Sequence, residues 1–400
     1  MMHAPIAHIE LEGEKRLTVG QELDLMRAAH ARMPSPAIRG QLARMLMLDD
    51  LFEEVIELLE GDAERDYRDE TFLSLAYLSR ENNIDDARAL NAANRAFAQS
   101  QNDLQRAAAL AARGKCEKRL GQVELAKSTL REALTLDPHN KDACKRLAAI
   151  MLDEGKLPDM IEWTEGMLLQ GVDHARLFGA RVLAYAKAGD MESARAAEGF
   201  DDLHRSEQLE PPEGWNSIEA FNAALAEELV NHPAMRYERY GSASELTWRI
   251  ENPARPDTPL FKMLIGQIVK TLHSHISALQ GSDHIWAAAC PENAFLRNWC
   301  VITESTGFET WHVHQFGWLS GVYYVQIPET IARGNSSNGC LAFGLPEELV
   351  GTETSEEFGQ HLVRPQSGML LTFPSHTYHR TYAHGTGEKR ICVAFDLRPN

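Results

Sequence analysis

Residues 309–315 read Glu309-Thr310-Trp311-His312-Val313-His314-Gln315, with two histidines separated by one residue. A β-rich run follows closely, Leu319-Ser320-Gly321-Val322-Tyr323-Tyr324-Val325. Side chains alternate across a strand, so His312 and His314 are expected to project from one strand face. Two imidazoles on one face need only a third ligand to make a metal site. His379 is a candidate for that ligand, because it precedes a final β-rich run that begins at Arg390.

Short β-rich runs are dense around this stretch and are separated by Gly, Pro, Asn and Ser. They span residues 284–289, 295–303, 319–327, 340–343, 360–363, 368–373 and 390–397, with no convincing helical pattern between them. Such a density of strands is typical of a sandwich or barrel of the jelly-roll type.

The upstream half of the chain has a different composition, because residues 21–202 are rich in helix-forming Ala, Leu, Arg and Glu. Gly121, Gly155 and Gly189 follow one another at intervals of 34 residues, each in a short polar break. The clearest unit contains Gly114, Gly121, Ala126, Ala133 and Asp137-Pro138, and it resembles the tetratricopeptide repeat. Ala194 stands at the same offset after Gly189, whereas the middle unit has Met160 there.

Such repeats stack into a solenoid whose concave groove commonly holds a protein or peptide, so we expect a partner of that kind. A generic Ala-rich helical bundle is the alternative. The break Glu210-Pro211-Pro212-Glu213-Gly214 favours a domain boundary. We therefore expect an α+β multidomain protein: a tetratricopeptide-like helical domain over 1–209, a linker with supporting helices over 210–283, and a jelly-roll core over 284–400.

Two helices are expected in the middle segment, over about 216–231 and 258–279, where capping and proline signals begin apolar stripes. His273 and His275 belong to the second of these helices. We interpret both as solvated surface residues rather than ligands.

Net charge, hydropathy and cysteine content limit the classes of partner and the cellular compartment that we expect. The net charge of −18 opposes attraction to nucleic acid and to anionic membranes. No stretch is long and apolar enough to span a membrane, and the N-terminus lacks the pattern of a secretory signal. The six cysteines form no C-x-x-C pair and indicate buried thiols of a reducing compartment. The cytoplasm is the expected location.

Residue type alone does not choose the metal. Imidazole suits Fe, Zn, Cu and Ni, three histidines also match catalytic zinc, and iron oxygenases more often use two histidines and a carboxylate. Alternatively, the His-x-His pair is simply two polar residues on a strand that bind no metal. His376 and His384 rival His379 as third ligand, but His376 is expected to point elsewhere and His384 lies in a polar turn. Asp396 alternates with Phe395 and Leu397, so it is expected to face solvent.

Three motifs that follow one another along the chain indicate a more specific class of protein. They are Trp311-His312-Val313-His314 through Val325, then Gly368-Met369-Leu370-Leu371-Thr372-Phe373-Pro374-Ser375 with His379, then Arg390-Ile391-Cys392-Val393-Ala394-Phe395-Asp396. Together they resemble the 2-oxoglutarate and iron(II)-dependent dioxygenases, and most closely the bacterial branch with tetratricopeptide repeats ahead of the oxygenase domain.

The resemblance covers about residues 289–399 and implies a double-stranded β-helix that uses Fe(II), 2-oxoglutarate and O₂ to hydroxylate a substrate. By position His312 matches the first metal-ligating histidine and His379 the distal one. Arg390 matches the basic residue that pairs with the far carboxylate of 2-oxoglutarate. Tyr324 matches a tyrosine that hydrogen-bonds the same carboxylate, with a core aromatic as its alternative role.

His314 departs from the family pattern, which usually has a carboxylate there. Three interpretations follow: a three-histidine iron site of His312, His314 and His379, a site that has drifted to zinc, or a register in which His314 aligns first. The expected function is a dioxygenase acting on a protein, a peptide or a small molecule. The alternatives are a non-catalytic adaptor with a degenerate barrel, and a three-histidine metalloprotein that does not use 2-oxoglutarate.

Overall fold

The computed structural model describes residues 8–62, 64–80, 85–237 and 243–400. The N-terminal stretch that lacks a signal pattern therefore lies largely outside the described residues. The chain divides into two compact units, one of residues 17–172 and the other of residues 1–16 with 173–400. Within the described part of the chain, no helix is long and apolar enough to cross a membrane.

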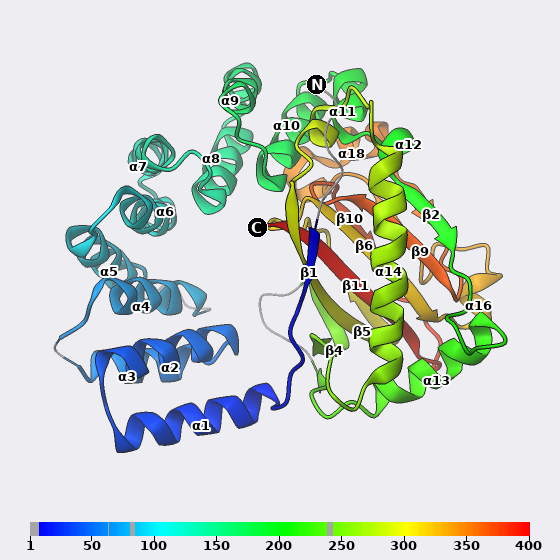
Figure 1. Ribbon diagram of the computed structural model, residues 1–400. Helices are drawn as coiled ribbons and strands as arrows, with labels where there is room; N and C mark the ends of the chain where they lie inside the picture. Colours follow the sequence, from blue (N-terminus) through cyan, green and yellow to red (C-terminus); the bar gives the residue numbers. More distant parts are fainter. Residues whose placement is uncertain (1–7, 63, 81–84, 238–242) are drawn as a thin grey trace. The chain divides into compact units, whose positions relative to one another are not determined.

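The first unit consists of successive helices that pack against their neighbours in the chain (Figure 1). Its core is built from small and aliphatic side chains such as Ala43, Val55, Leu73, Ala92 and Cys116. The helices are α1 (Val19–Arg32), α2 (Pro36–Leu48), α3 (Phe52–Glu60), α4 (Tyr67–Ser79), α5 (Asp86–Gln99), α6 (Asp103–Arg119), α7 (Val123–Leu136), α8 (Lys141–Asp153) and α9 (Leu157–Leu169).

The spacing of 34 residues between the three glycines has a local structural cause, because each of these glycines ends a helix. Gly121, Gly155 and Gly189 have φ of +77°, +68° and +82°, and each ends the first helix of a hairpin in the left-handed region that glycine adopts without strain. Close helix approach is equally visible at Gly114, where an added Cβ would lie 2.7 Å from the Leu130 side chain. The helical part is thus tetratricopeptide-like, as the sequence predicts.

The third of these hairpins belongs to the second unit. It comprises α10 (Ala175–Lys187) and α11 (Met191–Glu198), and the short α12 (Phe200–Leu203) follows it. Arg195 donates to the Glu357 carbonyl at 2.6 Å, and Lys187 donates to the Leu349 carbonyl at 3.3 Å. By secondary structure the chain is mainly helical up to Leu203, whereas the contacts divide it after Val172.

The second unit contains two sheets. The larger has the order β2-β9-β6-β11-β5-β4-β3 with β1 paired in parallel to β5, and the smaller has the order β10-β7-β8. All other pairings are antiparallel. The strands are β1 (His8–Leu11), β2 (Arg205–Gln208), β3 (Arg236–Tyr237), β4 (Ser244–Glu251), β5 (Asn293–Glu309), β6 (Leu319–Gln326), β7 (Leu341–Phe343), β8 (His361–Val363), β9 (Met369–Pro374), β10 (His379–Thr381) and β11 (Arg390–Pro399).

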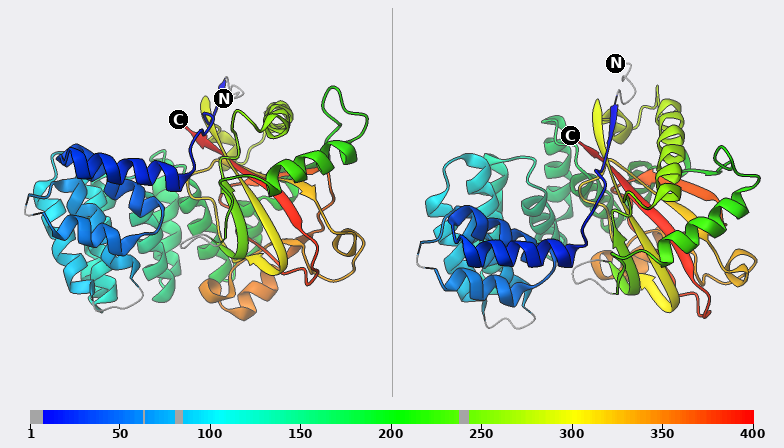
Figure 2. Two further views of the ribbon diagram at one scale, coloured as in Figure 1. Left: turned by 90° about the horizontal axis from the view of Figure 1, so that it is seen from below. Right: turned by 60° about the horizontal axis from the view of Figure 1, so that its bottom comes forward.

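The larger sheet is covered on both faces. Helices α13 (Ile218–Val230) and α14 (Pro259–Ala278) cover its outer face (Figures 1 and 2). On that face the Tyr323 hydroxyl donates to Asn222 Oδ1 at 2.8 Å. On the inner face Phe373 packs against Phe343 of the smaller sheet, with ring centroids 5.0 Å apart. These two facing sheets are the core of the double-stranded β-helix. We refer below to the side of the larger sheet that faces the smaller one as its inner face.

One expectation about α14 is wrong. His275 is buried at 8% exposure and its Nδ1 lies 2.9 Å from the Thr372 hydroxyl, so it is not a solvated surface residue. His273 is exposed, as expected. The difference arises because α14 lies flat on the sheet, and only one of two residues spaced by two positions on a helix can face outward.

The strand expected at 284–289 is also wrong, because this segment is the short helix α15 (Ile285–Ala288). His284 caps it by accepting the Trp286 N–H through Nδ1 at 3.1 Å. Trp286 then stacks on Trp318, and each indole donates to the other residue's carbonyl, at 2.9 and 3.0 Å. Three further short helices occur where none was expected: α16 (Glu329–Ala332), α17 (Glu347–Val350) and α18 (Thr352–Phe358).

Candidate metal centre

The connection between β5 and β6 carries the first two histidines. His312 and His314 lie in extended backbone just outside the named strands. His312 exchanges backbone hydrogen bonds with His379, at 3.0 and 3.1 Å, and the His314 N–H donates to the Ser375 carbonyl at 2.9 Å. This short ladder keeps the chain extended, so the two side chains point the same way even though the residues are not in a regular strand.

The third histidine is brought in by the same ladder. His379 begins β10, and its ring centroid lies 4.1 Å from that of His312 and 4.9 Å from that of His314. One nitrogen from each of the three rings lies within 4.8 Å of the others, which is the spacing of a metal-binding group. The structure therefore brings together the three histidines that the sequence indicates as candidate metal ligands.

Every Nδ1 atom of the cluster faces an oxygen of the protein. His312 Nδ1 lies 2.7 Å from the Thr310 carbonyl and His379 Nδ1 lies 3.0 Å from the Thr377 carbonyl. His314 Nδ1 lies 2.5 Å from Asp396 Oδ1. A carbonyl or carboxylate oxygen can only accept, so each Nδ1 carries the hydrogen, and in the neutral form of each ring the lone pair is then on Nε2. Metal-ligating histidines show this outer hydrogen bond almost always.

Burial keeps two of these rings neutral. Loss of solvent, with repulsion from His314, lowers the pKa of His312 to about 4. Loss of solvent, followed by repulsion from His312 and His314, also holds the pKa of His379 well below its usual value. Both rings therefore offer a lone pair at neutral pH, which a metal requires of its ligands.

Asp396 is the residue that the sequence reasoning missed. It was expected to face solvent, but it is 3% exposed and lies beside His314. Strand alternation failed here because both faces of β11 are covered, so alternate residues are buried in different surroundings. Burial alone would raise the pKa of Asp396, but His314, Arg398 and the Ser320 hydroxyl outweigh it and lower the pKa to about 2.

Arg390 and Tyr324 lie on the same inner face, farther along the sheet. Arg390 is six residues before Asp396 on β11, so both side chains are on one side of the strand. Arg390 is 4% exposed, and its guanidinium carbon lies 5.3 Å from the Tyr324 ring centroid. Its Nε has no hydrogen-bond partner, and no carboxylate within the described residues forms an ion pair with it.

Small and apolar side chains separate these two groups from the histidine cluster. Val322, Cys392 and Ala394 pack there with Trp299 and Tyr324 in one hydrophobic cluster. Trp299 reaches the histidines, with its ring centroid 5.4 Å from that of His314. Burial raises the pKa of Tyr324, with the nearby Arg390 acting in the opposite direction, so its phenol stays protonated and able to donate a hydrogen bond.

The rival histidines lie elsewhere. His376 is 1% exposed and its ring packs 5.3 Å from that of Phe178 on α10. His384 is 5% exposed, and its Nδ1 accepts the Thr386 N–H at 3.3 Å. Neither belongs to the cluster of His312, His314 and His379.

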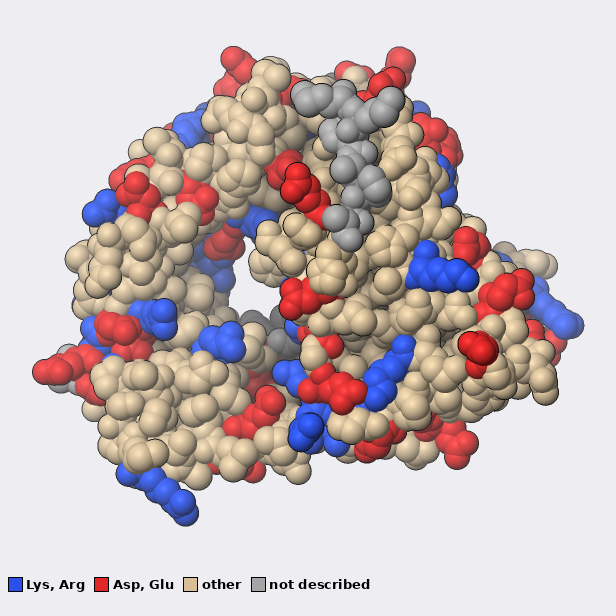
Figure 3. Space-filling model, viewed as in Figure 1, with Lys and Arg blue, Asp and Glu red and all other residues tan. Residues whose placement is uncertain are grey.

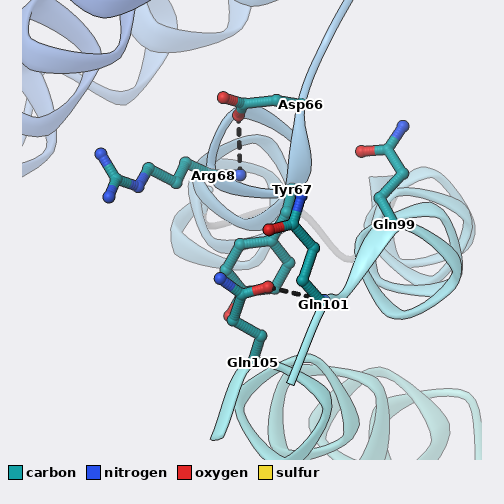
Figure 4. A pocket seen from close by; sticks show the side chains of 6 residues that line it. All are labelled: Asp66, Tyr67, Arg68, Gln99, Gln101 and Gln105. Atoms are coloured by element: carbon teal, nitrogen blue, oxygen red, sulfur yellow. Dashed lines mark hydrogen bonds between the residues drawn. The ribbon is translucent and has the colours of Figure 1, made fainter. Parts of the chain in front are cut away.

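The helical unit has a pocket of its own, of about 410 Å³. Figure 4 shows its lining residues, which come from α4, α5, α6 and the connection before α6: Asp66, Tyr67, Arg68, Gln99, Gln101 and Gln105. Glutamine amides both donate and accept hydrogen bonds. On the face of the molecule in Figure 3, Lys and Arg are interspersed with Asp and Glu rather than gathered into a basic patch.

Comparison with known proteins agrees with this geometry. Residues 297–396 match the family model described as "Putative 2OG-Fe(II) oxygenase", so the C-terminal part of the chain carries a domain of the 2OG-Fe(II) oxygenase family. That match contains His312, His314, His379, Arg390 and Asp396. No curated protein matches the chain.

Several solved structures are similar to part of the chain. A prolyl-4-hydroxylase from Pseudomonas putida is 17% identical, with a TM-score of 0.34, over 51% of this chain and 98% of that one. A prolyl hydroxylase from Trichoplax adhaerens, in complex with a hypoxia inducible factor peptide, is 11% identical, with a TM-score of 0.36, over 53% and 90%. YrrB, a TPR protein with an unusual peptide-binding site, is 16% identical, with a TM-score of 0.33, over 44% and 94%.

Proposed function

We propose that this protein is an Fe(II)- and 2-oxoglutarate-dependent dioxygenase that hydroxylates a protein, peptide or small-molecule substrate. The observation that carries the proposal is the buried Arg390, which has no acidic partner in the described part of the chain and shares the inner face of β11 with the histidine cluster. A buried charge without a partner is unfavourable, and a bound dicarboxylate would supply the missing negative charge.

In this proposal the Nε2 atoms of His312, His314 and His379 hold the metal. Arg390 binds the distal carboxylate of 2-oxoglutarate, because a guanidinium can donate two parallel hydrogen bonds to it. The Tyr324 hydroxyl donates to the same carboxylate. Bound Fe(II), with 2-oxoglutarate and O₂ as co-substrates, supplies the oxidising chemistry. The apolar residues between the two ends of the site exclude water from it.

An anaerobic titration tests the proposal. The protein is titrated with Fe(II) and then with 2-oxoglutarate, while the weak visible charge-transfer band of the ternary complex is followed. We expect the band in the wild type and its loss in Arg390→Met. Arg333→Met is the matched control, because Arg333 is 81% exposed and forms an ion pair with Glu329, four residues earlier in the chain. Admission of O₂ should then yield succinate.

Other outcomes select the alternatives. Metal binding without a 2-oxoglutarate band or succinate would overturn the dioxygenase and favour a three-histidine metalloprotein of another kind. Failure to bind Fe(II) together with tight Zn²⁺ binding would favour a site that has drifted to zinc. Failure to bind any divalent metal would favour a non-catalytic adaptor.

We further propose that the helical unit recruits a protein or peptide. Its pocket exposes the amides of Gln99 and Gln101 near Tyr67, and amides of this kind pair readily with the donors and acceptors of a peptide backbone. Peptides selected from a random displayed library on the full-length protein should lose binding in the triple variant Tyr67→Ala, Gln101→Ala, Gln105→Ala. Gln280→Ala, an exposed glutamine of the other unit, is the control. Equal binding to all variants would exclude this pocket.

The cytoplasm is the compartment that we propose. None of the six cysteines takes part in a disulfide, and five of them are buried. Thiols remain reduced in that compartment, and a reducing environment also keeps iron in the divalent state that the proposed chemistry needs.

A further inference from the structure

We propose that Asp396 is a positioning residue of the metal centre, which orients His314 and supplies the negative charge that a histidine in place of a carboxylate removes. The inference rests on the proposed metal site, but not on 2-oxoglutarate. In the 2-His-1-carboxylate arrangement of iron oxygenases, one ligand is an anion. Here the anion would lie one hydrogen bond beyond the metal ligand.

The contact between the two residues is direct and enclosed. Asp396 Oδ1 lies 2.5 Å from His314 Nδ1, and the two side chains are 4% and 10% exposed. The Ser320 hydroxyl donates to the same oxygen at 2.8 Å, and Arg398 donates to Oδ2 at 3.2 Å. A charged acceptor strengthens such a hydrogen bond and raises the basicity of the imidazole at its other nitrogen.

The surroundings leave His314 little freedom. Its N–H donates to the Ser375 carbonyl, and the Ser375 hydroxyl lies 2.7 Å from that of Ser320. Gly317 makes this approach feasible, because a Cβ there would come 2.3 Å from Ser375 Oγ and 3.4 Å from the Asp396 carboxyl carbon. Hydrogen bonds thus hold both the backbone and the ring of His314.

The three histidines differ in the partner that accepts the hydrogen bond from Nδ1. His312 and His379 donate to backbone carbonyls, which are neutral, whereas His314 donates to a carboxylate. By the resemblance described above, His314 is also the one that stands where iron(II) oxygenases usually have an acidic ligand. The charged partner is therefore found at the ligand whose own charge is missing.

Metal affinity tests the inference without reference to turnover. Dissociation constants for Co²⁺ and Zn²⁺ are measured by competition with a chromophoric chelator, and folding is followed by circular dichroism. We expect Asp396→Asn to weaken binding by roughly 10- to 100-fold, the range for loss of an outer partner of a ligand. Asp283→Asn, an exposed aspartate of the same unit, should bind as the wild type does. Equal constants for the three proteins would overturn the inference alone, whereas a wild type that binds neither metal would overturn the proposed site.

A second background separates charge supply from a structural role. In His314→Asp the ligand position itself becomes anionic, so Asp396 turns from a partner into a like-charged neighbour. Adding Asp396→Asn to this variant should tighten metal binding, which reverses the sign of its effect in the wild type. If Asp396 only stabilised the fold, its replacement would weaken binding in both backgrounds, and that result would refute the inference.

Arg398→Gln provides a variant that leaves Asp396 in place. It removes the positive charge from Oδ2, so the carboxylate acts more strongly on His314. Arg398 is 28% exposed, and we therefore expect metal binding to tighten by only about two- to fivefold. Weaker binding would contradict the proposed role of the charge.

Discussion

His312 and His379 exchange both of their backbone hydrogen bonds, N–H to carbonyl, at 3.0 and 3.1 Å. The two residues are 67 positions apart in the chain, and this isolated bridge is what places their rings 4.1 Å apart. The backbone thereby sets the register of the two residues. Because the fold already brings the ring nitrogens together, binding of a metal would need little rearrangement.

Removal of one ligand should separate the two candidate distal histidines. His379→Ala is expected to weaken Co²⁺ and Zn²⁺ binding by more than the roughly 100-fold upper range for loss of an outer partner. His376→Ala should retain wild-type affinity, because its ring packs on Phe178 and outside the cluster. Competition with a chelator measures both constants. Loss of metal from the His376 variant with retention by the His379 variant would reverse the assignment.

Tyr324→Phe removes a single buried oxygen that has no hydrogen-bond partner among the residues that the structure describes. The free energy of unfolding should stay the same or rise, because an unpaired buried hydroxyl is destabilising. Affinity for 2-oxoglutarate should fall by about 5- to 13-fold, which corresponds to one hydrogen bond of roughly 1–1.5 kcal/mol. Chemical denaturation and titration of the charge-transfer band provide the two measurements. Unchanged affinity would leave Tyr324 as a core aromatic.

The buried His376 should make the second unit sensitive to acid. Loss of solvent, with repulsion from His284, lowers the pKa of His376 to about 3 in the folded protein. In the unfolded chain the value is about 6.5. The unfolded state therefore takes up a proton that the folded state does not, and the free energy of unfolding falls as pH decreases from about 6.5 toward 3. One such histidine contributes up to about 1.4 kcal/mol per pH unit.

Urea denaturation of the metal-free protein at pH 7, 6 and 5 measures this slope. Intrinsic fluorescence reports on the second unit, because six of the seven tryptophans lie outside residues 17–172. His312 and His379 contribute to the slope in the same direction, so the difference between wild type and His376→Gln isolates one residue. An identical slope in the two proteins would contradict the buried neutral state of His376.

Two glycines of the helical unit should respond in opposite directions to alanine. At Gly114 an added Cβ would lie 2.7 Å from the buried Leu130 side chain, so Gly114→Ala should destabilise the unit by about 1–3 kcal/mol. Gly166 lies within α9 with no atom within 4 Å of the added Cβ. Gly166→Ala should stabilise by about 0.5–1 kcal/mol. Thermal unfolding followed by circular dichroism distinguishes the two, and equal shifts would contradict the close packing of α6 and α7.

Much of the architecture was accessible from local patterns. The expected runs at 295–303, 319–327, 340–343, 360–363, 368–373 and 390–397 all contain strands, because β-rich segments between turn residues carry their own signal. The larger sheet also recruits β1, β2 and β4 from far outside these runs. β4 belongs to a region where no element could be assigned, since its pairing with β5 depends on a neighbour about 50 residues away.

The sequence by itself determined the helical hairpins and the shared direction of His312 and His314. In both cases the cause is local: a glycine with positive φ every 34 residues, and the alternation of an extended chain. Only the tertiary structure decided where Asp396 lies. Alternation assigns residues to faces but does not say which faces are solvated, and in β11 neither is. The His314–Asp396 contact and the burial of Arg390 therefore emerge only when both sides of the sheet are covered.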